Sequence, residues 1–382
     1  MVAGHLQEKK GKYYIVLSFK DENGKRKTQW KSTGLTVKGN KKKAEEMLQT
    51  ARQGFVLPRQ IKEGIILSDY LDEWVELHKV NVEETTYCSY KRHIKKINEH
   101  FRPKEFLLQD VKPKDIQEFY FDMLKTRKSS TVLNYHLVLH NALAYAVKMD
   151  IIPSNPCDKV ERPKPVDSKA TFCNAEEIQK LYDVIKGKDI ELIVKIALFY
   201  GMRRGEVIGL KWNAIDFQND TIAIKHTVAM TSKDGKLILI AKDRAKTKSS
   251  LRTYPLTAEF KQELLDRKMW IEENKKLCGK SYIIEWEEYV FVNPLGYLIK
   301  PDELTFKFTY LVKKHKLKKM RFHDLRHTTA SLMVANGVNM KQIQDWLGHS
   351  TFMTTADIYS HLDSSAKQLS ANAMTEALRN VV

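Results

Sequence analysis

The stretch Arg321-Phe-His-Asp-Leu-Arg-His327 holds a histidine and an arginine three residues apart, His323 and Arg326. On a helix this interval places both side chains on one face. Three other segments of the second half carry polar residues of the same kinds: Tyr200-Gly-Met-Arg-Arg-Gly-Glu-Val207, Trp346-Leu-Gly-His-Ser350 and Thr354-Thr-Ala-Asp-Ile-Tyr-Ser-His361. A single histidine or tyrosine is a weak signal, because it is most often part of a core or a surface. Taken together, the four segments make sense if their polar side chains converge on one phosphate.

These residue types suit the cleavage of a phosphodiester bond. A planar arginine guanidinium donates two hydrogen bonds to one phosphate and stays charged. Histidine moves protons near neutral pH. Tyrosine is a possible nucleophile, although its unperturbed pKa of about 10 requires cationic neighbours or a base. Nothing in the chain resembles the glycine-rich loop that binds ATP phosphates.

The composition predicts a folded protein with a polyanionic partner. The chain has 382 residues, 42% of them apolar, which is enough for two or three domains. Its net charge of +18 fits nucleic acid or an anionic membrane. The sequence has no run of about eighteen apolar residues and no apolar signal core, so we expect a cytosolic protein. The cysteines form no Cys-x-x-Cys pair and predict buried thiols rather than disulfides or a zinc site: Cys88, Cys157, Cys173 and Cys278.

Residues 1–56 predict a small basic α+β domain, with thirteen Lys or Arg against five Asp or Glu. The expected elements are a strand from Tyr13 to Phe19, a turn at Asp21-Glu-Asn-Gly24, a strand from Lys25 to Thr33, a third strand near 35–37, and a helix from Asn40 to Gly54. Lysine-rich strands suit a DNA groove, with Lys25, Lys27 and Lys31 as candidate contacts. The alternative is a solvated hairpin without a ligand.

Residues 65–160 predict an all-helical bundle after a linker over residues 57–64. Four helices are expected: one capped by Ser68, one from Thr85 or Thr86 to Phe101, one from Pro113, and one from Ser129 or Ser130 to Lys148. The second helix is basic, and its candidate DNA contacts are Lys91, Arg92 and Lys95. A charge run of this kind is also typical of a solvated surface, which is the alternative.

Residues 170–382 follow a second linker, residues 161–169, and predict a mainly helical domain with a small antiparallel sheet. The sheet is expected between Thr221 and Pro255, with Asp234-Gly235 as a hairpin turn. A tail helix over residues 364–380 is predicted from an apolar stripe: Leu369, Ala373, Met374, Ala377 and Leu378. The predicted fold class is therefore multidomain, with an α+β, an all-α and a mainly α part.

The four quoted segments, in this order, resemble those of the tyrosine recombinases, the phage-integrase family of site-specific DNA recombinases. The resemblance is specific over residues 170–362 and architectural over residues 1–160. It implies a catalytic set of six residues: Arg203, Lys246, His323, Arg326, His349 and Tyr359. Glu206 would orient Arg203. The adjacent Arg204 falls at a variable position of the motif, so a structural role or a contact with the DNA backbone is expected for it.

The resemblance also implies a role for each of these side chains. The two arginines would bind the phosphate oxygens, and Tyr359 would be the nucleophile. His323 would assist deprotonation of the tyrosine, and His349 would hydrogen-bond the phosphate. Lys246 would protonate the departing 5′ hydroxyl. Lys248 lies two residues on, where a strand would point it the same way, so it stays open as an alternative and is otherwise a candidate DNA contact.

The function implied is that of an integrase of a temperate phage or conjugative transposon, acting at the nucleoid in a bacterial cytoplasm. It would use a 3′-phosphotyrosine and a Holliday junction, without metal, ATP or another cofactor. Expected partners are double-stranded DNA with core-type and arm-type sites, a homotetramer in which the tail helix docks in trans, an excisionase and a DNA-bending host protein; no membrane is expected. A type IB topoisomerase-like enzyme and a catalytically idle DNA-binding protein of the same fold stay open as alternatives.

Overall fold

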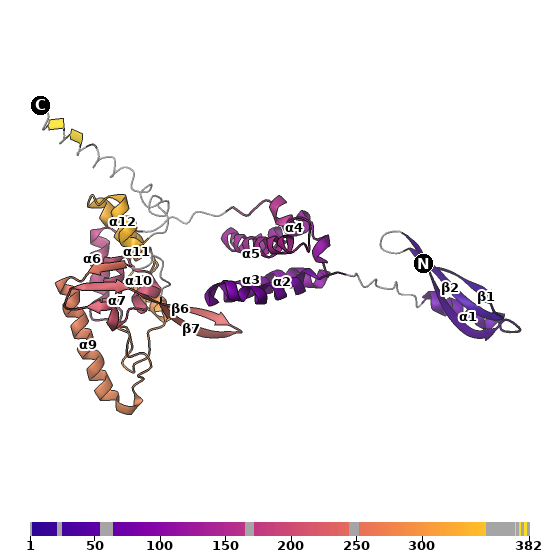
Figure 1. Ribbon diagram of the computed structural model, residues 1–382, viewed down its shortest axis with the longest axis horizontal. Helices are drawn as coiled ribbons and strands as arrows, with labels where there is room; N and C mark the ends of the chain where they lie inside the picture. Colours follow the sequence, from indigo (N-terminus) through magenta and orange to yellow (C-terminus); the bar gives the residue numbers. More distant parts are fainter. Residues whose placement is uncertain are drawn as a thin grey trace. The chain divides into compact units, whose positions relative to one another are not determined.

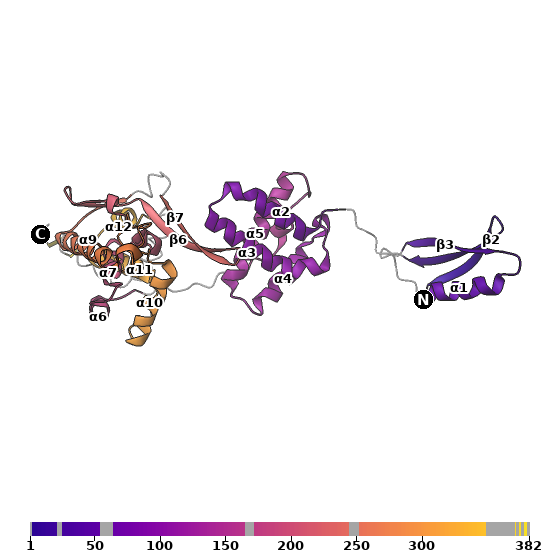
Figure 2. The ribbon, with the colours of Figure 1, turned by 90° about the horizontal axis from the view of Figure 1, so that it is seen from below.

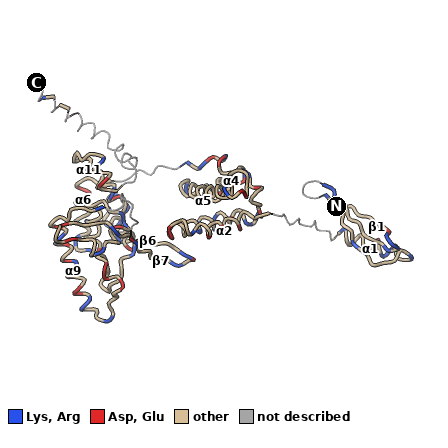
Figure 3. The backbone as a smooth tube through the Cα atoms, viewed as in Figure 1, with Lys and Arg blue, Asp and Glu red and all other residues tan. Residues whose placement is uncertain are grey.

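The computed structural model describes residues 2–20, 25–53, 64–164, 172–243 and 252–348, together with the tail residues 371, 374, 375, 378 and 379. The chain forms two compact units. The first comprises residues 1–65 with residues 107–109, and the second comprises the rest. Lys and Arg are distributed over both units rather than gathered in one (Figure 3).

The N-terminal unit is a three-stranded antiparallel sheet with a helix beside it (Figures 1 and 2). Its elements are β1 (Ala3–Lys9), β2 (Lys12–Lys20), β3 (Arg26–Thr36) and α1 (Lys41–Gln53). The strands pair in the order β1-β2-β3, which leaves β3 at an edge. Ile15 and Leu17 of β2 and Ala44 of α1 are buried, as the apolar alternation of β2 requires for a sheet covered on one face.

The predicted strand from Tyr13 to Phe19, the returning strand and the helix are confirmed within the described residues. The sequence prediction misses β1, whose only large aliphatic residue is Leu6. A separate third strand near 35–37 is wrong, because β3 itself continues to Thr36. The predicted turn at residues 21–24 lies outside the described residues.

The second unit begins with a helical bundle that is built of α2 (Leu67–His78), α3 (Glu84–Phe101), α4 (Pro113–Leu124) and α5 (Ser129–Lys148), with short 3-10 turns at Lys79–Asn81, Arg102–Lys104, Leu108–Asp110 and Pro156–Lys159. The four predicted helices are confirmed. Ser68 is not a cap, however, because α2 already begins at Leu67 and Ser68 is buried within it. Large aromatic side chains fill the bundle, among them Trp74, Phe101, Phe119 and Tyr120.

The remaining part of this unit is mainly helical and carries two small antiparallel sheets. Its helices are α6 (Ala175–Ile185), α7 (Glu191–Tyr200), α8 (Arg204–Ile208), α9 (Ala258–Cys278), α10 (Pro301–Lys314), α11 (Asp324–Ala335) and α12 (Met340–Leu347), with 3-10 turns at Trp212–Ala214 and Gly279–Ser281. One sheet has the order β4 (Ile215–Asp216), β5 (Thr221–Ile224), β8 (Arg252–Pro255). The other is the hairpin of β6 (His226–Lys233) and β7 (Lys236–Asp243), which extends away from the helices of this part in both views (Figures 1 and 2).

The predicted hairpin turn at Asp234-Gly235 is confirmed, with φ of 49° and 80° at these two residues. The single sheet expected between Thr221 and Pro255 is in fact two, because β8 pairs with β5 and not with the hairpin. Among the cysteines, Cys88, Cys157 and Cys173 are buried free thiols as predicted, whereas Cys278 is only partly buried.

Helix α7 packs against a helix that comes from far along the chain. Almost all of its apolar side chains are buried, including Ile193, Val194 and Tyr200. It packs against α11, whose Thr329 hydroxyl donates a hydrogen bond to the Leu198 carbonyl. This packing brings the C-terminal end of α7 to the N-terminal end of α11.

The tail residues that the structure describes are helical, and Met374 and Leu378 are exposed. The other residues of the predicted helix 364–380 lie outside the described part. No described helix has the length and apolar character needed to cross a membrane.

Candidate active site

The first predicted arginine sits between two helices and is fixed by a single carboxylate. Helix α7 ends at Gly201, Arg203 is the N-cap of α8, and Glu206 lies in the first turn of α8. The Arg203 main-chain N–H donates to Glu206 Oε2 at 2.9 Å, and its Nη1 donates to Oε1 at 2.8 Å. Glu206 therefore fixes both the backbone and the guanidinium of Arg203. This is the orienting role that the resemblance implies for Glu206.

Gly201 ends α7 in the left-handed conformation, with φ of 62°, and a Cβ there would overlap Leu347 Cδ2. We expect Gly201→Ala to destabilise the protein by about 2–4 kcal/mol, of which backbone strain supplies about 1–2 and overpacking the rest. Gly187→Ala is the matched control, because Gly187 has φ of 71° and open space where a Cβ would stand. Urea unfolding of the three proteins measures the difference. Equal losses in the two variants would contradict the close approach of Leu347.

The second predicted arginine joins three helices at one point. Arg326 lies in the first turn of α11 and is 2% exposed. Its Nη1 donates to the Gly201 carbonyl at 2.7 Å, and its Nη2 donates to the Leu347 carbonyl at 2.5 Å. Burial, and next the charge of Arg203, lower the pKa of Arg326 to about 9, which still leaves it charged at neutral pH.

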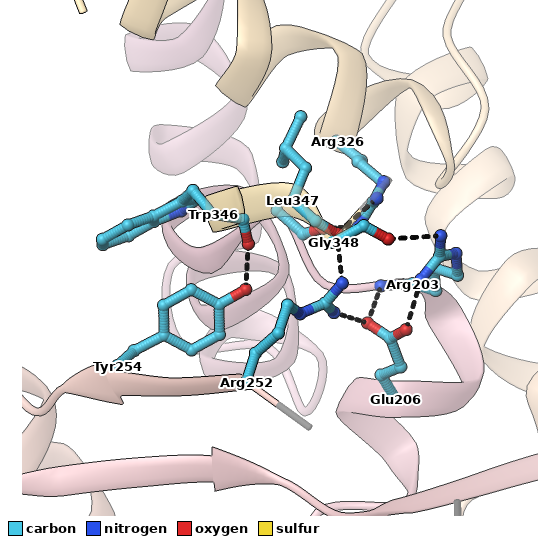
Figure 4. Close-up of polar contacts among 9 residues, drawn as sticks. Arg203, Glu206, Arg252, Tyr254, Arg326, Trp346, Leu347 and Gly348 are labelled. Atoms are coloured by element: carbon cyan, nitrogen blue, oxygen red, sulfur yellow. Dashed lines mark hydrogen bonds and ion pairs between the residues drawn. The ribbon is translucent and has the colours of Figure 1, made fainter. Parts of the chain in front are cut away.

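The C-terminal end of α12 faces these arginines. The last carbonyl groups of a helix have no partner within the helix and carry a partial negative charge. Here the Leu347 carbonyl accepts from Arg326 and Arg252, and the Gly348 carbonyl accepts from Arg203 Nη2 at 3.4 Å (Figure 4). His349 follows Gly348 directly in the sequence. The helix end is thereby tied to the two predicted phosphate ligands.

The cluster carries more positive than negative charge. Three guanidinium groups, those of Arg203, Arg252 and Arg326, donate to the carbonyls at the end of α12, beside a single carboxylate, that of Glu206 (Figure 4). Glu206 pairs with Arg203 and Arg252 at 2.8 Å and 2.7 Å. The Arg203 side chain is 38% exposed, so it presents this surplus charge to solvent. Such a site suits an anion with several oxygen atoms, as a phosphate has.

His323 stands immediately before α11, next to His327, with the two ring centroids 5.2 Å apart. Partial desolvation of the ring, followed by the charges of His327 and Arg326, lowers the pKa of His323 to about 4. The imidazole is therefore neutral at pH 7 and able to accept a proton. A bound phosphate would raise this pKa again, because an anion favours the charged form.

We expect an NMR titration of His323 in the DNA-free protein to show a midpoint well below the ordinary value of about 6.5. His327→Gln should raise that midpoint, because it removes a neighbouring charge. Between pH 6.5 and 4 the unfolded state takes up the proton first, so His323 lowers the stability of the fold as the pH falls through this window. His323 is exposed, so this loss is smaller than the pKa alone suggests. A midpoint at or above 6.5 would contradict the desolvated site.

The structure thus brings Arg203, Glu206 and Arg326 together and places His323 at the start of the same helix as Arg326. The other members of the predicted set, Lys246, His349 and Tyr359, and the alternative Lys248, lie outside the described residues. Arg204 is held by α10: its Nη1 donates to Thr305 Oγ1 at 2.6 Å and to the Pro301 carbonyl at 3.2 Å. Sequence reasoning missed Arg252, since nothing local marks an arginine at the start of a strand.

Six of the eight candidate DNA contacts lie at or on two elements, β3 and α3. Lys25, Lys27 and Lys31 precede or belong to the edge strand β3. Lys91, Arg92 and Lys95 lie on α3, where Lys91 pairs with Glu76 at 3.5 Å and with Asp234 of the hairpin at 3.3 Å. These six residues stay predictions. No group of three His, Cys, Asp or Glu side chains suited to a metal ion occurs among the described residues.

Comparison with known proteins matches both parts of the second unit. The phage integrase family model matches residues 171–366, and the model of the SAM-like N-terminal domain of phage integrases matches residues 66–124. The chain is 28% identical over 372 residues to a XerC-like tyrosine recombinase of Caldanaerobacter subterraneus, covering 93% of this chain and 94% of that protein. It is 25% identical over 347 residues to the ICEBs1 integrase of Bacillus subtilis, covering 90% and 92%.

Two solved structures share the fold. The Tn1549 transposon integrase in complex with circular intermediate DNA has a TM-score of 0.67 at 24% identity, covering 82% of this chain and 100% of that one. A lambda integrase tetramer bound to a Holliday junction has a TM-score of 0.56 at 18% identity, covering 91% and 95%. With the family model spanning half of the sequence and the arginine site in place, this chain belongs to the phage integrase family of tyrosine recombinases.

Proposed function

We propose that this protein is a site-specific integrase that integrates and excises a mobile genetic element. Tyr359 attacks the scissile phosphorus, and the bond from phosphorus to the 5′ oxygen breaks, which leaves a 3′-phosphotyrosine. The 5′ oxygen takes a proton from Lys246, and His323 assists removal of the phenolic proton. A 5′ hydroxyl of the partner duplex then attacks the phosphotyrosine and releases Tyr359. Two such exchanges pass through a Holliday junction and need no ATP.

The observation that carries the proposal is the meeting of Arg203, Arg326 and the end of α12. Arg203 and Arg326 lie more than a hundred positions apart in the sequence. Their guanidinium groups nevertheless contact adjacent carbonyls, those of Gly348 and Leu347. Fixed cationic groups that bind the developing charge on a phosphate stabilise the transition state of its transfer. His349 comes next in the chain, and Tyr359 ten residues later, which supports one shared site.

The proposal also assigns residues to DNA binding and to the assembly of several copies on DNA. Lys25, Lys27 and Lys31 would contact arm-type sites; Lys91, Arg92, Lys95 and Lys248 would contact core-type sites. Arg204 would either support α10 or contact the DNA backbone. Four copies would act on DNA, with the exposed Met374 and Leu378 of the tail helix docking on a neighbour. An excisionase and a DNA-bending protein complete the expected partners. Similar integrases have been solved on DNA and on a Holliday junction, which supports this assembly.

The test is a suicide-substrate assay. The protein is incubated with nicked duplexes that carry candidate attachment sites, in EDTA, and the products are separated on a denaturing gel. We expect a covalent adduct whose peptide map identifies Tyr359. Binding of the duplex without an adduct would favour the idle DNA-binding alternative. Relaxation of supercoiled plasmids by a monomer, without recombination between two sites, would favour the topoisomerase alternative.

A further inference from the structure

Arg252 is a buried cation to which the proposed chemistry gives no role. It opens β8 and is 7% exposed. Its Nη2 pairs with Glu206 Oε2 at 2.7 Å, and its Nη1 donates to the Leu347 carbonyl (Figure 4). Both partners also hold a predicted phosphate ligand, Glu206 holding Arg203 and Leu347 holding Arg326. Arg252 is thus linked to both Arg203 and Arg326 through partners that it shares with them.

The Glu206 carboxylate is divided between two guanidinium groups. Oε1 accepts from Arg203 Nη1 at 2.8 Å, while Oε2 accepts from Arg252 Nη2 and from the Arg203 main-chain N–H. Arginine and carboxylate prefer a bidentate pair when nothing else competes. Because Arg252 occupies Oε2, Arg203 is held through one guanidinium nitrogen. Its remaining donors are left for other acceptors, and one of them contacts the Gly348 carbonyl at 3.4 Å.

Arg252 also fixes the end of α12 from the side of the sheet. It shares the Leu347 carbonyl with Arg326, and Tyr254, two residues on along β8, donates its hydroxyl to the Trp346 carbonyl (Figure 4). Residues two apart on a strand face the same side, so Arg252 and Tyr254 of β8 bond two successive carbonyls of the helix end, those of Leu347 and Trp346. Gly348 follows with φ of 64°, and a Cβ there would overlap Arg252 Nη1. The backbone therefore passes directly over this guanidinium.

We propose that Arg252 is a positioning residue for strand cleavage. It holds Glu206 so that Arg203 keeps free donors for the phosphate, and it holds the end of α12, where Arg326 shares the Leu347 carbonyl with it. The inference rests on the proposed function, in which Arg203 and Arg326 bind the scissile phosphate. Arg252 itself does not touch the DNA in this role. Its loss therefore lowers the cleavage rate and leaves the affinity for DNA largely unchanged.

The experiment compares Arg252→Met and Arg252→Lys with the wild-type protein. Single-turnover adduct formation is measured at saturating nicked duplex, and the dissociation constant of the same duplex is measured separately on an uncleavable form. Small displacements of groups that orient a reacting centre cost about 100-fold in rate. We expect Arg252→Met to lose about that factor with the dissociation constant changed less than about threefold. Arg252→Lys keeps the charge but only one bonding centre, so we expect a loss of about tenfold.

The matched control is Arg267→Met in α9. Arg267 is a partly buried arginine of the same unit, and it donates to the main-chain carbonyls of Val290 and Val292, which are not among the residues of the site. Rates are normalised to the folded fraction of each protein. If Arg267→Met slows cleavage as much as Arg252→Met, the role of Arg252 is only structural and the proposal is overturned. If Arg252→Met does not fold, Arg252→Lys decides, and a lysine variant within twofold of the wild-type rate overturns the proposal.

Failure of the proposed function gives a different result. A wild-type protein that forms no adduct on any duplex that it binds would overturn the proposed function, and this inference with it. A competent wild-type protein with equally competent Arg252 variants would overturn the inference alone.

Discussion

Tyr359→Phe is expected to abolish the covalent adduct while the protein still binds its DNA sites. The phenol oxygen is the atom that would bond to phosphorus, and phenylalanine lacks it, so no other step can replace the lost one. Removing a nucleophile from a cooperating set of groups typically costs about 10⁴-fold or more in rate. The dissociation constant should change less than about threefold, because a single hydroxyl contributes little to an interface in which phosphate contacts dominate.

Denaturing gels of the nicked duplex measure the adduct, and a filter or gel-shift titration measures the affinity. Tyr297→Phe provides the matched control, since Tyr297 is 49% exposed and lies in the loop before α10. It should form the adduct at the wild-type rate. An adduct that survives in Tyr359→Phe would mean that another residue is the nucleophile. Loss of DNA binding in the same variant would mean that Tyr359 supports the fold.

The sequence predicts two local pairs of the site that lie among the described residues. The structure places His323 and Arg326 at the start of α11, three residues apart, and pairs Arg203 with Glu206. Both relations are local, within one turn of helix; spacing predicts the first, and the resemblance to the family implies the second. The meeting of Arg203 with Arg326 is not local, and only the resemblance to a family implies it.

Arg252 shows where the sequence is insufficient. Its two partners, Glu206 and Leu347, are 46 and 95 positions away. Its role depends on β8 pairing with β5 rather than with the hairpin, so that the strand reaches the end of α12. No pattern of apolar residues in the sequence predicts such a contact. The same holds for β1, since a strand that pairs at an edge with few apolar residues has too weak a pattern for prediction.

The error at Ser68 has a simpler cause. A serine before an apolar run at helical spacing is typical of an N-cap. Leu67 is nevertheless 1% exposed and already lies within α2, so burial of that leucine places the helix start ahead of the serine. Tertiary packing overrides the local preference here. The position of a helix end depends on which side chains are buried in the core, and the local sequence does not predict that.

Glu206→Gln is expected to be the most damaging substitution to the fold of the site. The Glu206 side chain is 1% exposed and pairs with the guanidinium groups of Arg203 and Arg252, and the Arg252 side chain is itself 6% exposed. A neutral amide leaves those cations without their counter-charge and also replaces an acceptor oxygen by a donor. Breaking a buried ion pair by removing one partner costs about 3–5 kcal/mol. Because Arg203 loses the group that orients it, cleavage should also fall by about 100-fold.

Glu177→Gln is the control that separates these effects from the loss of a helix cap. Glu177 forms the same capping box on α6, with Asn174, and pairs with Lys318, but it lies at the surface. Its loss should cost no more than about 1 kcal/mol and leave the cleavage rate unchanged. Urea unfolding and single-turnover adduct formation on both variants measure the difference. If Glu206→Gln were as mild as Glu177→Gln, the buried carboxylate would not be what holds Arg203 and Arg252 in place.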